Sequence, residues 1–279
     1  MSASIFDPSA YEGRNGFAPQ PIRCHHLKAL GLAPIFAKTA LSGVEDDPTA
    51  EMSLGTTVHG IIQGRKDILV YRGAVRRGKE WEAFREKYPT AHIVLDKEMK
   101  TAEGMAAALL AHKDAAQLLK ARGVKREETI IFDYLGRICR ATPDLRAGPK
   151  AHSWVAELKT TKCAKPELFR RDAERLGYHV QLAMQSEAIR QATGAAPKDH
   201  YIIAIDNRPS PPWPIVVNRV DEDSIERGHR QFRLWMEQLL VCEASGYWPG
   251  YAEDVVPLKI GEAPLGLTYA DDAADEATP

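Results

Sequence analysis

The stretch that decides the fold spans residues 142–161 and reads TPDLRAGPKAHSWVAELKTT. From Ser153 onward it has the apolar and β-branched composition of a buried strand. Because strand side chains alternate between two faces, Glu157 and Lys159 project from the same side. Burying a carboxylate and an ammonium is costly unless they are paired or hold a metal. With Asp144 they predict a hard-cation site beside an amine, which is the chemistry of metal-dependent phosphodiester cleavage.

The spacing of these three residues leaves a second interpretation open. The same sequence is equally consistent with an exposed aspartate next to an ordinary Glu–Lys pair along a strand. A glycosidase with Asp144 and Glu157 as an acid–base pair is a weaker alternative, because Lys159 has no role in it and no aromatic-rich segment lines a sugar cleft.

Bulk composition limits the class of protein. The chain has 279 residues, of which 44% are hydrophobic and 27% charged, values typical of soluble globular proteins. The net charge is −1, so a nucleic-acid substrate would have to be held by a local positive surface. We expect no signal peptide, no membrane span and a cytoplasmic location, because no basic start precedes an apolar run and no run approaches ~18 apolar residues. Without a P-loop motif, ATP hydrolysis is not expected.

The four cysteines and one histidine pair are further potential metal ligands. No Cys-x-x-Cys motif is present, which argues against structural zinc and favours reduced thiols, although distant cysteines could converge on an iron–sulfur cluster. We interpret His25 and His26 as exposed imidazoles on an N-terminal helix. The cysteines are Cys24, Cys139, Cys163 and Cys242.

The hydrophobic periodicity predicts a chain of helices, then strands, then alternating elements. Three consecutive strands predict an antiparallel meander, in which Asp144 and Glu157 meet across a hairpin, and a later strand makes the sheet mixed. The acidic tail 271–279 is predicted to be disordered. The predicted helices are 22–41, one starting near 55, 75–87, 101–122, 166–176, 178–191 and 223–244, and the strands are 129–134, 137–142, 153–160, 200–206 and 214–218.

Five motifs, in this order, resemble those of the RecE-type exonucleases, also called exodeoxyribonuclease VIII, in the PDDEXK nuclease superfamily. They cover roughly residues 50–251, and the opening segment 23–34 is similar to that family's first helix. The motifs are Gly55-Thr-Thr-Val-His59, Arg140-Ala-Thr-Pro-Asp144, Val155-Ala-Glu-Leu-Lys-Thr-Thr161, Gly177-Tyr-His-Val-Gln181 and Trp248-Pro-Gly-Tyr251.

The resemblance implies an α/β (α+β) fold with a restriction-endonuclease-like core, in which helices flank a mixed central sheet. Additional helices are expected at both ends of the chain. The implied organisation is an N-terminal extension at 1–50, a nuclease domain at 51–251 with a helical insertion at about 75–125, and a C-terminal tail at 252–279.

Site residues follow from the same resemblance. His59, Asp144, Glu157 and the carbonyl of Leu158 would bind one or two Mg²⁺ or Mn²⁺ ions, with Lys159 as the catalytic lysine. Considered alone, His59 would more often be an ordinary core histidine, and Tyr178 could simply pack against the sheet. The residues implied to contact substrate are Thr160, Tyr178, His179 and Gln181.

The implied activity is exonuclease cleavage of double-stranded DNA ends, 5′ to 3′, for recombination beside a single-strand annealing protein. A ring-shaped homo-oligomer is also implied. The alternatives are a structure-specific or nicking endonuclease and a scaffold that binds DNA or a partner without cutting. The chain departs from the family at Thr142, at Gln63 and Gly64, and at Gln185, where a tyrosine is usual, so DNA binding and cutting rate are expected to differ from those of the family.

Overall fold

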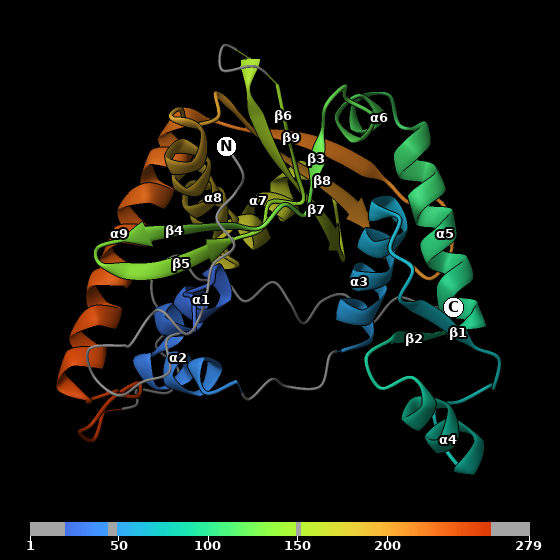
Figure 1. Ribbon diagram of the computed structural model, residues 1–279, viewed down its shortest axis with the longest axis horizontal. Helices are drawn as coiled ribbons and strands as arrows, with labels where there is room; N and C mark the ends of the chain where they lie inside the picture. Colours follow the sequence, from blue (N-terminus) through green and yellow to red (C-terminus); the bar gives the residue numbers. More distant parts are fainter. Residues whose placement is uncertain (1–19, 44–48, 149–151, 258–279) are drawn as a thin grey trace.

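The computed structural model describes residues 20–43, 49–148 and 152–257 (Figure 1). The elements of the described part follow in this order: α1 Cys24–Leu32, α2 Pro34–Leu41, α3 Ala50–Gln63, β1 Ile68–Tyr71, α4 Lys79–Lys87, β2 His92–Leu95, α5 Asp96–Ala111, α6 Lys113–Leu119, β3 Lys125–Arg126, β4 Ile130–Tyr134, β5 Arg137–Ala141, β6 Leu145–Ala147, β7 Trp154–Thr161, α7 Pro166–Arg175, α8 Tyr178–Thr193, β8 Asp199–Asp206, β9 Ile215–Val220 and α9 Glu222–Ser245.

A five-stranded mixed sheet forms the centre, in the order β3-β6-β7-β8-β9. Strands β7 and β8 are parallel, and the other neighbours in this sheet are antiparallel. The parallel pair is joined through α7 and α8, because a chain that re-enters a sheet in the same direction needs a crossover. The predicted α/β class, with helices flanking a mixed sheet, is confirmed.

Each face of the sheet is covered by its own hydrophobic core. Ala156 and Leu158 of β7 pack into the core formed with α3, α5 and α6. Val155 packs into the core formed with α1, α8, α9 and the β4–β5 hairpin. The two groups of helices lie on opposite sides of the sheet in Figure 1. Strand β7 is therefore buried on both sides, which makes its charged residues, Glu157 and Lys159, exceptional.

The predicted three-stranded meander is wrong in its pairing. Strands β4 and β5 form a separate two-stranded hairpin beside α9, turning at Leu135 and Gly136, whose φ angles are 55° and 77°. Pro143 follows the end of β5 and cannot donate to a strand ladder. The chain enters the central sheet after it as β6, where Leu145 pairs with Ala156. Asp144 and Glu157 still become neighbours, through this short strand.

The N-terminal segment is part of the core. Leu27 and Leu30 on α1 are almost fully buried, in the same cluster as α8 and α9. His26 is also buried, and its Nδ1 accepts a hydrogen bond from the backbone N–H of Arg23. The prediction of two exposed imidazoles is therefore wrong for His26, since this ring caps the helix and packs inward.

The segment predicted as a helical insertion at 75–125 contains more than helices. It includes β2, which pairs in parallel with β1 just before the segment, and the two-residue strand β3 at its end. Short strands of this kind have too few residues to show a clear period in the sequence. The tail 271–279 lies outside the described residues. Among the described helices, none is long and apolar enough to cross a bilayer.

Candidate active site

Two neighbouring chain segments bring the candidate carboxylates and the lysine together. Asp144 lies just before β6, and Glu157 and Lys159 lie on β7, its antiparallel partner. The backbone N–H of Leu158 donates to Asp144 Oδ2 at 2.8 Å, and the N–H of Asp144 approaches Glu157 Oε1 at 3.3 Å. The strand register therefore sets the two carboxylates side by side.

Helix α3 carries His59 to the same place. The side chain of Thr49 caps the helix by accepting from the N–H of Met52, and Gly64 ends it in the left-handed conformation. Gly55 lets the helix approach the sheet, because a Cβ there would lie 2.9 Å from Thr160 Oγ1. His59 Nδ1 then lies 3.5 Å from an oxygen of Asp144.

Glu157 is the most buried member of the cluster, with 2% of its side chain exposed. Its oxygens accept from Lys159 Nζ at 2.6 Å, from Gln181 Nε2 at 2.5 Å and from Gln185 Nε2 at 2.6 Å. Gln181 and Gln185 are four residues apart, so they lie on one face of α8. A buried carboxylate of this kind is tolerated because donors surround it.

The charges of the cluster shift one another's pKa. Burial and the neighbouring Asp144 both raise the pKa of Glu157. Burial opposes ionisation of Asp144, but the His59 imidazole and the Lys159 ammonium outweigh it and hold the pKa of Asp144 below its usual range. In Lys159, burial is likewise outweighed by the two carboxylates, so its pKa is raised and the amine stays charged. Asp144 also overcomes the effect of burial on His59 and raises the pKa of this ring.

The residues predicted to contact substrate are divided between two places. Gln181 belongs to the cluster, and the Tyr178 ring lies 5.3 Å from Lys159 Nζ. Thr160 points toward α3, at the close approach of Gly55. His179 does not join the cluster, because it projects from a different face of α8 than Gln181 does.

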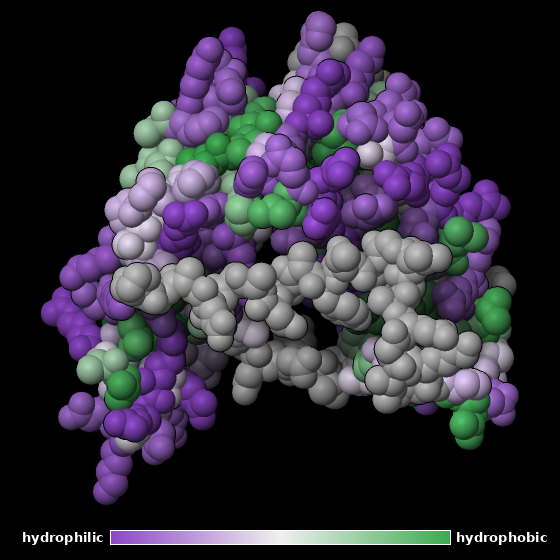
Figure 2. Space-filling view, turned by 180° about the vertical axis from the view of Figure 1, so that it is seen from behind, coloured by the Kyte–Doolittle hydropathy of each residue, from purple (hydrophilic) through white to green (hydrophobic). Residues whose placement is uncertain are grey.

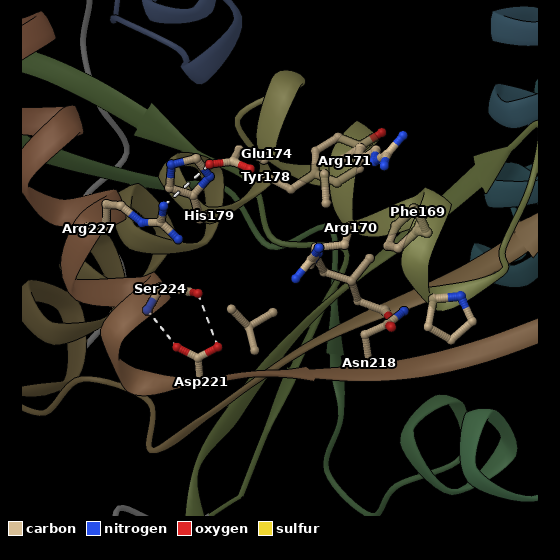
Figure 3. A pocket seen from close by; sticks show the side chains of 14 residues that line it. Phe169, Arg170, Arg171, Glu174, Tyr178, His179, Asn218, Asp221, Ser224 and Arg227 are labelled. Atoms are coloured by element: carbon tan, nitrogen blue, oxygen red, sulfur yellow. Dashed lines mark hydrogen bonds and ion pairs between the residues drawn. The ribbon is translucent and has the colours of Figure 1, made fainter. Parts of the chain in front are cut away.

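His179 instead lines a neighbouring cavity of about 490 Å³ between α7, α9 and the β8–β9 edge (Figure 3). Arg170 and Arg171 of α7 and Arg227 of α9 also line it, together with the acidic Glu174 and Asp221, and Arg227 forms an ion pair with Glu174. Tyr178 lines this cavity as well. Tyr178 thus borders both the carboxylate cluster and a polar cavity lined by charges of both signs.

Two site residues were not predicted from the sequence. In the sequence Gln185 stands out only as a departure from the family pattern, although its spacing from Gln181 is a signal that both amides face one target. Lys28 of α1 donates to Gln181 Oε1 at 3.3 Å and lies 5.2 Å from the Tyr178 ring centroid. No local pattern could reveal Lys28, because this contact joins residues 153 positions apart.

The donor set suits a hard divalent cation. Carboxylate and carbonyl oxygens are the ligands that Mg²⁺ and Mn²⁺ prefer. Two adjacent ligands of an octahedral ion at ~2.1 Å lie about 3 Å apart, close to the 3.5 Å between His59 Nδ1 and Asp144 Oδ1. As the described side chains stand, no three of the His, Cys, Asp and Glu types are grouped around one point. Glu157 faces Lys159 and the glutamines, so binding an ion requires it to give up one of these donors.

A mixed sheet that presents Asp144, Glu157 and Lys159 at this register defines the class of protein, the PDDEXK nuclease superfamily. The chain belongs to the family described as "PDDEXK-like domain of unknown function (DUF3799)", whose pattern matches residues 27–259. The match begins inside α1, in agreement with the packing of this helix into the core.

Among solved structures, the chain is similar to a "Putative exonuclease" from Eubacterium rectale, with a TM-score of 0.61 and 15% sequence identity. That similarity covers 88% of this chain and 94% of the other, and at this identity it concerns the fold. SSO0001 matches with a TM-score of only 0.28, at 13% identity over 77% of this chain and 85% of the other, so it supports no conclusion. No curated protein matches the chain.

Proposed function

We propose that this protein is a divalent-metal-dependent deoxyribonuclease that acts on the ends of double-stranded DNA, as a RecE-type exonuclease does. The observation that carries the proposal is the convergence of His59, Asp144, Glu157 and Lys159 from three separate segments. The five ordered motifs and the family support it. The solved structure described as a putative exonuclease has a fold similar to that of this chain.

His59, Asp144, Glu157 and the carbonyl of Leu158 would hold the ion or ions. When bound, Mg²⁺ or Mn²⁺ supplies Lewis-acid polarisation of the scissile phosphate. Lys159 already donates to Glu157 and is about a fifth exposed, so its remaining N–H groups can reach an attacking water. The same ammonium can stabilise negative charge that develops on the phosphate.

Residues around the cluster would position the DNA strand. Gln181 and Tyr178 lie directly beside Lys159 and would contact the nucleotide at the cleaved bond. Thr160 follows Lys159 on the strand, on the side that faces α3. His179, in the cavity that Tyr178 also lines, would contact a more distant part of the strand.

The biological setting is also proposed. It includes 5′ to 3′ resection for recombination, a single-strand annealing partner, a ring-shaped homo-oligomer and a cytoplasmic location. A ring would place basic surfaces from several subunits around one DNA, which would reconcile a net charge of −1 per chain with a polyanionic substrate.

Linear and closed-circular duplexes of the same sequence test the activity. With Mg²⁺ or Mn²⁺ we expect nucleotide release from the linear duplex only, because an exonuclease needs an end. Lys159→Met should lower the rate by about 10²-fold or more, whereas Lys162→Met, an exposed residue just past β7, should not. Cutting of the circle would favour the endonuclease alternative. Metal-dependent binding without any release would favour the scaffold.

Metal binding can be followed without any DNA. At 100 times its dissociation constant, an ion that binds only the folded state stabilises it by about 2.7 kcal/mol. For a chain of this size, that raises the melting temperature by roughly 5–10 °C. Asp144→Asn should abolish the rise, and the exposed Asp114→Asn on α6 should keep it. An equal rise in both variants would place the ion elsewhere.

A further inference from the structure

A concentration of positive charge lies away from the cluster, between β1 and the start of α4. Residues 72–79, here called the basic loop, read RGAVRRGK, with four basic residues and no acidic one. All four basic side chains are exposed. In a chain of net charge −1, this concentration points to a specific anionic partner.

The basic loop is held in shape by its own contacts. Arg76 forms an ion pair with Glu98 at the start of α5 and donates to the carbonyl of Ile93. The Tyr71 ring packs directly over Gly73, where a Cβ would come within 2.3 Å of it. Among the described residues, Arg72 and Arg77 make no ion pair. The contacts of Arg76 and Tyr71 fix the loop that carries these two arginines, and their charges face solvent.

Helix α4 extends the basic loop without entering the core. It has no buried residue, and it contacts β1 through Trp81 and Phe84, whose rings lie 5.2 Å from that of Tyr71. Together, β1, the basic loop, α4 and β2 form an arm that projects at the lower right of Figure 1 and the lower left of Figure 2, where its surface is mostly hydrophilic. Because its aromatic rings contact one another, base stacking is a poor use for this arm and contact with phosphates is a better one.

The arm is attached to the turn of α3 that carries His59. On one side of this turn, Thr57 Oγ1 bonds to His92 Nε2 of β2 at 2.9 Å. On the other side, Gly60 admits the side chain of Ile68 of β1, whose Cδ1 would lie 2.4 Å from a Cβ at that position. Both strands of the arm are therefore seated within three residues of a candidate metal ligand.

From these contacts we infer that the arm is a second DNA-contacting site, in which the basic loop binds the phosphate backbone of the duplex whose end lies at the cluster. The inference rests on the proposed function. Duplex DNA carries one negative charge per ~1.7 Å of its axis, so a loop of this length meets several phosphates. Arginine guanidinium groups on a fixed loop pair well with phosphate oxygens. Binding through this arm is expected to be independent of base sequence.

The test compares two double variants of equal charge change. Arg72→Gln with Arg77→Gln removes two charges from the basic loop. Lys113→Gln with Arg122→Gln removes two exposed charges around α6, at the opposite end of α5. Binding of a labelled 20-base-pair blunt duplex is measured by fluorescence anisotropy in EDTA, between 50 and 200 mM salt, after thermal unfolding has shown that both variants are folded.

We expect the basic-loop variant to bind the duplex about tenfold more weakly than the wild type at the lowest salt. When the logarithm of its affinity is plotted against the logarithm of the salt concentration, the slope should be smaller in magnitude by about 2. The reason is that each of the two lost phosphate contacts contributes about 0.9 to the slope. The α6 variant should match the wild type. In cleavage assays with Mg²⁺, only the basic-loop variant should show a raised KM for the duplex.

Other outcomes separate this inference from the proposed function. If the wild type cuts linear duplex but the basic-loop variant binds it with unchanged affinity and slope, the arm does not contact DNA. Equal weakening in the two variants would mean a general charge effect and would also overturn the inference. A wild type that neither binds nor cuts DNA would end both proposals, and the arm would then face an acidic protein partner.

Discussion

Glu157 carries the largest desolvation burden of the cluster, and its surroundings explain how the fold tolerates it. Its carboxylate is compensated by one ammonium, two side-chain amides and one backbone N–H. Each hydrogen bond to a charged group contributes roughly 1.5–3 kcal/mol, which offsets a penalty of several kcal/mol for burial. Gln181 and Gln185 both direct their amide N–H groups at this carboxylate.

Lys28 holds one of these glutamines from a distant helix. Its Nζ donates to Gln181 Oε1, and in the described chain no carboxylate pairs with it; burial lowers its pKa. Lys28→Met should therefore misorient Gln181 and lower kcat about tenfold, with a smaller change in KM. Lys28→Arg should restore part of the rate. The exposed Lys38→Met on α2 is the control, and a Lys28→Met enzyme with normal kcat would show that the contact is only structural.

At the scale of elements, the position of α8 depends on how closely α9 approaches it. Gly228 of α9 lies against the backbone of α8, where a Cβ would be 2.3 Å from the carbonyl oxygen of His179. A backbone atom cannot move aside as a flexible side chain can. Tyr178 and Gln181 flank this carbonyl on α8, so the same contact positions their side chains relative to the carboxylate cluster.

Gly228→Ala should therefore destabilise the protein, although alanine is the better helix former by about 1 kcal/mol. Overpacking typically costs about 1–3 kcal/mol, and the rigid backbone here favours the upper part of that range. Urea unfolding measures the change. Gln238→Ala, exposed on the same helix, should alter the free energy of unfolding by less than about 0.5 kcal/mol. A Gly228→Ala protein more stable than the wild type would mean that the helices lie further apart.

At the scale of the whole molecule, buried histidines link stability to pH. Burial and two nearby cationic groups, His25 and Arg23, lower the pKa of His26 to about 3. Burial and the neighbouring His229 lower the pKa of His200 to about 4, and Ser186 is its hydrogen-bond partner at 2.6 Å. Both rings are nearly inaccessible, so they stay neutral where an unfolded chain binds protons.

The sign of the effect follows from these directions. Below pH 6.5 the unfolded state takes up protons that the folded state does not, so the free energy of unfolding falls as the pH falls toward 4. By pH 5 each histidine should remove up to about 2 kcal/mol. Urea unfolding at pH 7, 6 and 5 measures this loss, and His200→Asn should make it smaller by up to about 2 kcal/mol at pH 5. A stability that stays level between pH 7 and 5 would show that the rings are not buried.

Local sequence determined the elements of the core and the chemistry of the site. Apolar periodicity predicts strand β7 and helices α3, α8 and α9, because burial on one or two faces leaves a repeating pattern in the sequence. The pairing of Glu157 with Lys159 also follows, since alternation along a single strand requires no knowledge of the rest of the fold.

Only the tertiary structure decided which distant segments meet. Packing between elements leaves no periodic pattern in the local sequence. It decides the place of β6 in the sheet, the separate β4–β5 hairpin and the burial of His26. The same holds for Lys28 and Gln185, which reach the cluster through contacts across the molecule, and for the arm at the His59 turn. Such contacts form because a folded chain buries surface wherever complementary faces fit, however far apart their residues lie in sequence.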